Sequence, residues 1–197
     1  MKRKVTKAAP GTGAGPHNSW DGCAETGHST APASKQMENV HKNRNTSPTT
    51  INASITLAKI LAPGHDQNRF KITDGAAITG YLITAKLAGP ESCNCDSKNS
   101  IDHDIHLELV ADKTVVAENK RMICEITPRW RKRLGQNGVV ANLEALARRG
   151  ARVRITGWMF FDPDHENESE NTHPGSPKNW RATGWEIHPV TKFEALD

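Results

Sequence analysis

The sequence has few aromatic residues, few cysteines and no long apolar run, and each shortage excludes a class of protein. One tyrosine, four phenylalanines and five tryptophans among 197 residues form no obvious row of exposed aromatics, which many single-strand-binding sheets carry. Four cysteines are too few for a disulfide-built scaffold. No apolar run approaches membrane-spanning length and no signal-peptide pattern is evident, so we expect a cytoplasmic protein without a membrane partner.

The first fifty residues contain almost no large apolar side chains and are rich in Ser, Thr, Asn, Pro, Gly and Lys. Such a segment cannot bury enough surface to offset its chain entropy. It holds seven Lys/Arg and three Asp/Glu, whereas the rest of the chain holds nineteen of each, so the whole net charge of +4 lies in it. We therefore predict a disordered basic tail over 1–50, a lead-in segment over 51–68 and one domain over 69–197.

Strand-like segments dominate the rest of the sequence. They are rich in β-branched residues or alternate in polarity, and glycines lie inside the first and the fourth, as at tight bends of a barrel. One segment with an N-cap asparagine and a terminal glycine reads as a helix. The order is three strands, one helix and two strands, which is the order of elements in an OB-type barrel. We therefore predict an all-β fold with one helix, in the form of a five-stranded OB-type Greek-key barrel. The strands are expected at 77–87, 104–110, 121–127, 151–161 and 180–193, and the helix at 142–149.

Short phrases add a resemblance to this pattern. The strand order and the segment GARVRITG at 150–157 resemble the OB-fold superfamily over about the last two thirds of the chain. The segments DIH at 104–106, EITPR at 125–129 and WEIHPV at 185–190 are similar to a group of largely uncharacterised bacterial proteins. The resemblance implies the fold but no established reaction or catalytic residue, since a shared fold is weak support for shared chemistry.

Polar residues at alternate positions of otherwise apolar strands form the first candidate site. Alternation places them on the outward face of the barrel, where neighbouring strands lie about 4.8 Å apart. Imidazole and carboxylate together suit a divalent transition metal such as Zn or Mn, which could activate water in a nuclease or esterase. The simpler interpretation is a face exposed to water. His165 is added from the loop before the fifth strand, so the candidate ligands are Asp104, His106, Glu125, His165, Glu186 and His188.

A basic segment with a central tryptophan forms the second candidate site. Basic side chains can hold phosphates while an exposed aromatic stacks on a base, as in single-strand-binding barrels. The leading prediction is therefore an OB-type module that binds single-stranded nucleic acid or another polyanion. A metal-dependent hydrolase and a protein-interaction module are the alternatives, which leaves open whether the protein is an enzyme. The expected contacts are Arg129, Trp130, Arg131, Lys132 and Arg133.

Two further segments bear on the ligand. Cys93, Cys95 and His103 could supply zinc ligands, but the one-residue gap between the cysteines is tighter than usual zinc spacing, and reduced, partly exposed thiols are the preferred interpretation. Cys124 lies in an apolar strand and is expected to be buried. The loop at 162–179 begins with acidic residues, which favour a metal or small ligand over bare DNA.

Overall fold

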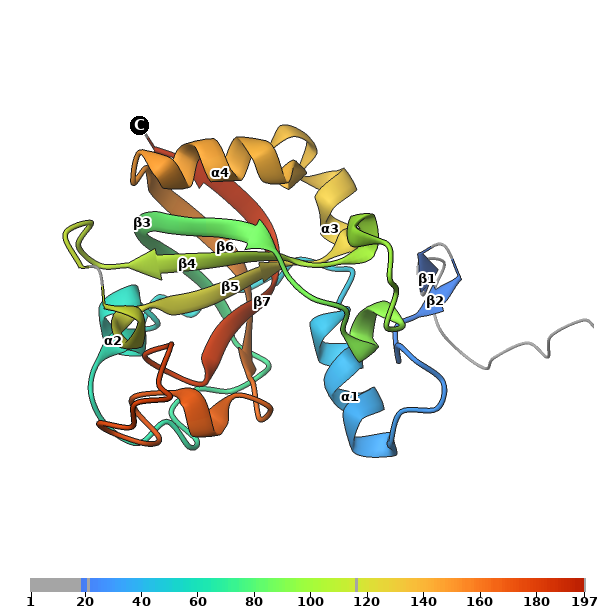
Figure 1. Cartoon of the computed structure of the whole chain (residues 1–197), viewed down its shortest axis with the longest axis horizontal. Helices are drawn as coiled ribbons and strands as arrows, with labels where there is room; N and C mark the ends of the chain where they lie inside the picture. Colours follow the sequence, from blue (N-terminus) through green and yellow to red (C-terminus); the bar gives the residue numbers. More distant parts are fainter. Residues whose placement is uncertain (1–18, 21, 116, 197) are drawn as a thin grey trace, which may run out of the picture.

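A closed barrel of five strands forms the centre of the computed structural model, which describes residues 19–20, 22–115 and 117–196 (Figure 1). The barrel closes because the first strand pairs with both the second and the fourth. All its pairings are antiparallel except the one between the third and the fifth strand, which is parallel. The strands are β3 (Gly75–Leu87), β4 (Ile105–Val110), β5 (Met122–Ile126), β6 (Arg152–Phe161) and β7 (Trp185–Ala195). The sequence-based prediction of five barrel strands is confirmed.

Alternation along each strand separates an apolar interior from a polar outer face. In β4, Leu107 and Leu109 belong to the core, while His106 and Glu108, at the alternate positions, lie on the opposite face. In β6, an added Cβ at Gly157 would collide with the backbone oxygen of Pro189, so only glycine permits the approach of β7 there. The outer face of β4 is largely covered, because every residue of this strand is buried.

Four α-helices occur in the described part of the chain, so the prediction of a single helix is wrong. They are α1 (Ala33–Lys42), α2 (Leu57–Leu61), α3 (Pro128–Arg133) and α4 (Val140–Arg148). The helix expected at 142–149 is α4, which lies across one end of the barrel in Figure 1. Pro128 does end the preceding strand, but it also starts α3, since proline suits the first position of a helix. None of the described helices is long and apolar enough to cross a membrane.

The predicted tail is folded from Gly22 onward, so the boundary at residue 50 is wrong. Residues 1–18 lie outside the described part of the chain, and the short pair β1 (Ser19–Trp20) and β2 (Cys23–Ala24) precedes α1. Polar contacts hold this segment: Arg129 donates to Asn43 Oδ1 over 2.6 Å and to the carbonyl of Cys23 over 3.1 Å. Folding here depends on specific hydrogen bonds rather than apolar burial, and residue composition does not reveal such bonds.

A disulfide between Cys23 and Cys95 joins the N-terminal segment to the loop between β3 and β4. The expectation of reduced, partly exposed thiols in this loop is wrong, because Cys95 is oxidised and Cys93 is buried. Cys124 is a buried free thiol, as the sequence predicts. His103 is nearly buried, and its two ring nitrogens contact the backbone carbonyls of Ala88 and Ser97 at 2.9 Å. A zinc site built from Cys93, Cys95 and His103 is therefore excluded.

Candidate acid–base cleft

A cleft of about 400 Å³ opens on the outer face of the barrel, and we call it the outer cleft. Its floor comes from β4, β5 and β7, and its walls come from α1, the loop between β3 and β4, and the loop between β6 and β7. Five of the six predicted metal ligands line it, and Asp104 lies directly behind His188. The lining includes Lys42, Glu91, His106, Glu125, Asp162, His165, Trp180, Arg181, Glu186 and His188.

Strand register brings His106 and Glu125 together, because they are directly opposite each other on β4 and β5. His106 Nδ1 lies 2.7 Å from Glu125 Oε1, and His106 Nε2 lies 3.2 Å from Glu108 Oε1. Burial alone would lower the pKa of His106, but the two carboxylates outweigh it and raise this pKa to about 9. His106 is therefore an imidazolium near neutral pH and donates to both glutamates.

Glu125 has one oxygen without a partner. Oε2 is buried and accepts no hydrogen bond from the described residues, whereas Oε1 is held by His106. Burial raises the pKa of Glu125, against the opposing attraction of the His106 imidazolium. A buried carboxylate with a raised pKa and a free oxygen is a stronger proton acceptor than an exposed glutamate.

A second chain of charges begins at Asp104 and crosses the floor. His188 is fully buried, with Nε2 lying 3.1 Å from Asp104 Oδ2 and Nδ1 lying 3.3 Å from Glu186 Oε2. Burial opposes its positive charge, but these carboxylates raise the pKa of His188 to about 10. Glu186 Oε1 in turn lies 2.8 Å from Arg181, whose side chain is completely buried. The floor thus holds cations and anions in alternation.

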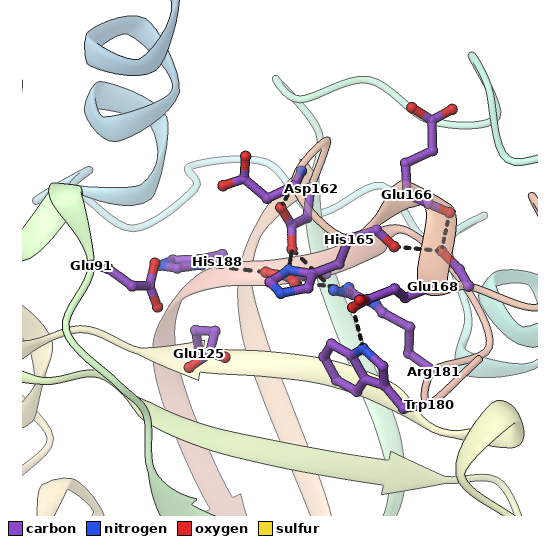
Figure 2. Close-up of polar contacts among 12 residues, drawn as sticks. Glu91, Glu125, Asp162, His165, Glu166, Glu168, Trp180, Arg181 and His188 are labelled. Carbon is purple, nitrogen blue, oxygen red and sulfur yellow. Dashed lines mark hydrogen bonds and ion pairs between the residues drawn. The ribbon is translucent and has the colours of Figure 1, made fainter. Parts of the chain in front are cut away.

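The last member of this series of charged side chains is His165, in the long loop between β6 and β7 (Figure 2). Asp162 Oδ2 contacts His165 Nδ1 at 2.7 Å and Arg181 Nη1 at 3.0 Å. The hydrogen bond to Asp162 raises the pKa of His165, and the pKa of Asp162 lies far below its usual range because His165 and Arg181 outweigh its burial. His165 Nε2 forms no hydrogen bond or ion pair with the described residues, and the side chain is 44% exposed. This arrangement orients one imidazole nitrogen for proton transfer in the cleft.

Helix α1 contributes a lysine that the sequence-based analysis did not identify. Lys42 Nζ lies 2.8 Å from Glu91 Oε2 and 5.6 Å from the centroid of the Phe160 ring. Its pKa is raised, because attraction to Glu91 and to other nearby acidic groups outweighs burial. No signal in the sequence pointed to this residue, since it lies in the segment assigned to a disordered tail. Trp180 was expected to begin the fifth strand, but it lies in the loop before β7, where it is half-buried and lines the cleft.

The donors of the cleft do not fit a transition metal in this arrangement. Both ring nitrogens of His106 and of His188 already contact carboxylates, and an imidazolium has no lone pair for a metal. One group of suitable donors, Glu91, Cys93 and Asp104, does lie within 4.8 Å of one another. The ammonium of Lys42 contacts Glu91, however, and the pKa of the Cys93 thiol is raised by burial, so neither favours a cation.

The basic segment predicted to contact nucleic acid is largely internal. Trp130 is buried, and its Nε1 donates to the carbonyl of Arg44, so the expectation of an exposed stacking ring is wrong. Arg129 is buried against the N-terminal segment, and Arg131 donates to the carbonyls of Ile101 and His103. The two exposed members are Lys132 and Arg133, and the Arg133 guanidinium lies 4.8 Å from the Trp130 ring centroid.

No protein-family model and no curated protein matches this sequence.

Proposed function

We propose that the protein is an OB-type barrel whose outer cleft is a hydrolytic site that works by acid–base catalysis without a metal. The strand order β3-β4-β5-β7-β6, with its single parallel pair between the third and fifth barrel strands, supports the OB-type assignment. The helices α3 and α4 between the third and fourth strands agree with it. The buried, partly unpaired carboxylate of Glu125 is the observation that carries the catalytic proposal.

Glu125 acts as the general base. Burial raises its pKa, while His106 fixes the side chain through Oε1 and leaves Oε2 without a hydrogen-bond partner among the described residues. Glu108 Oε1 contacts His106 Nε2, and Glu108 Oε2 accepts hydrogen bonds from Arg121 over 2.7 Å and from Thr84 over 2.8 Å. The base is thus held by a rigid hydrogen-bonded network, as an efficient proton acceptor requires.

His165 acts as the general acid. Asp162 raises the pKa of this imidazole, so that a larger fraction is protonated near neutral pH than for a free histidine. In the reaction, Glu125 takes a proton from water, the water oxygen attacks the substrate, and His165 Nε2 gives a proton to the leaving group. Glu125 comes from β5 in the floor of the cleft, and His165 comes from the loop between β6 and β7 that forms part of its wall (Figure 2).

Nucleic-acid binding by the basic segment loses most of its support, because Arg129 and Trp130 are occupied inside the protein. The metal-dependent variant of the hydrolase loses support because both ring nitrogens of His106 and of His188 already contact carboxylates. The disulfide also favours an oxidising compartment over the cytoplasm that the sequence suggested, since such bonds are rare in reducing environments.

The proposal is tested with chromogenic esters, phosphodiesters and glycosides, assayed in chelator. We expect turnover of one class by the wild type, and a loss of about 10²-fold or more in kcat in Glu125→Gln and in His165→Gln. Glu118→Gln and His173→Gln are matched controls, because both residues lie outside the cleft lining. Turnover that requires added metal, or that survives Glu125→Gln, would refute the proposal.

A further inference from the structure

Every charged side chain that lines the outer cleft has a partner of opposite charge. Lys42 contacts Glu91 at 2.8 Å, and Arg181 contacts Asp162 and Glu186 at 3.0 and 2.8 Å. At the rim, Lys86 lies 3.8 Å from Glu108, and Asp164 lies 2.6 Å from Lys35 of α1. A phosphate or another anion would have to compete with these carboxylates for each cation. The cleft therefore offers many hydrogen-bond donors and acceptors but little net charge.

Trp180 provides one flat, rigid wall of the cleft. Its Nε1 donates to Glu168 Oε2 over 2.6 Å, and the Arg181 guanidinium lies 5.2 Å from the ring centroid. The His165 ring meets the indole edge to face, with centroids 5.3 Å apart. The indole remains half-buried and still contributes surface to the cleft (Figure 2). An indole fixed in this way can receive a flat apolar surface at little cost in side-chain entropy.

We propose that the outer cleft binds an uncharged saccharide, with one sugar ring packed on Trp180. A sugar ring has an apolar C–H face and a rim of hydroxyls, and each hydroxyl donates one hydrogen bond and accepts others, which suits paired acids and bases. The inference takes its site from the proposed function and names its substrate class. The volume of about 400 Å³ is within the range of small-ligand sites.

The corresponding reaction is hydrolysis of a glycosidic bond. Water attacks the anomeric carbon as the bond from that carbon to the leaving oxygen breaks, Glu125 accepts the water proton, and His165 donates a proton to the leaving oxygen. The products are two saccharides, and no oxidant, reductant or further reactant is needed. His165 takes the place of the carboxylic acid that most glycoside hydrolases use.

Binding is measured by calorimetry on full-length Glu125→Gln protein, so that the ligand is not consumed. The probes are neutral trisaccharides of glucose, xylose, mannose, galactose and N-acetylglucosamine, with hexathymidylate as the competing class. We expect at least one trisaccharide to bind with a Kd of about 1 mM or lower, independent of salt between about 0.05 and 0.5 M. Addition of Trp180→Ala should weaken this binding about tenfold or more, whereas Trp180→Phe should retain most of it.

Trp158→Ala is the matched control, because this half-buried indole donates to the carbonyl of Thr46 outside the cleft. Each variant is checked for an unchanged circular dichroism spectrum. Absence of saccharide binding, or salt-sensitive binding of hexathymidylate that Trp180→Ala removes, would overturn the proposed ligand class. Saccharide binding without cleavage by the wild type would instead refute only the hydrolytic function.

Discussion

The disulfide between Cys23 and Cys95 should be the largest single contribution of the N-terminal segment to stability. The two residues are 72 positions apart, and chain-entropy arguments give about 4 kcal/mol for a loop of this size. With a urea m-value of about 2 kcal/mol/M, the unfolding midpoint of Cys23→Ser/Cys95→Ser should fall by about 2 M. The double variant avoids leaving one unpaired thiol that could form disulfides between molecules.

The same perturbation should reach the outer cleft. The disulfide anchors β2, which precedes α1 in the N-terminal segment, and α1 supplies Lys42 to the cleft and Lys35 to its rim. Cys124→Ala is the control, since it removes a buried thiol that forms no disulfide and should cost about 1 kcal/mol. Thiol titration in denaturant without reductant should find two free thiols. Four titrating thiols, or a double variant with the wild-type midpoint, would refute this reasoning.

The remaining predictions concern pH and internal contacts. The pH profile of kcat/KM should be bell-shaped. The midpoint of its acid limb should lie above pH 4.5 because the pKa of Glu125 is raised, and the midpoint of its alkaline limb should lie above pH 6.5 because the pKa of His165 is raised. Midpoints at or below these values would contradict the assigned roles. The pKa of His188 is about 10 in the folded state, so its contribution to stability is complete below pH 6.5 and is lost as the pH rises toward 10; urea unfolding at several pH values should show this loss, and His188→Gln should flatten it. Arg129→Met should cost about 3 kcal/mol by leaving Asn43 Oδ1 buried without its donor, and a thermal midpoint equal to that of the wild type would show that the contact is dispensable. Leu143→Ala, in the face of α4 that packs on the barrel, should cost about 3 kcal/mol in the same assay, since the residue is fully buried.

Sequence patterns predicted the barrel strands because their signal is local. Alternation of apolar and polar residues defines β4 and β5 to within a residue at each end. The predicted fifth strand began at residue 180, five residues before β7. Arg181 in that stretch is fully buried and paired with two acids, and pairing between distant side chains leaves no periodic signal. Similarly, the N-terminal segment folds through hydrogen bonds to residues 86 positions away, which its composition does not indicate.

The candidate metal ligands show where such reasoning stops. Strand alternation correctly placed His106, Glu125, Glu186 and His188 on one outer face, because side-chain direction follows from strand register. Their chemistry depended on what covers that face. The N-terminal segment and the loop between β6 and β7 bury His106 and His188 together with carboxylates that contact both of their ring nitrogens. Burial alone would lower the pKa of these imidazoles, and the neighbouring carboxylates raise it instead. A histidine and a carboxylate on adjacent strands therefore predict proximity, whereas the choice between metal ligand and proton carrier is made by the residues packed over them.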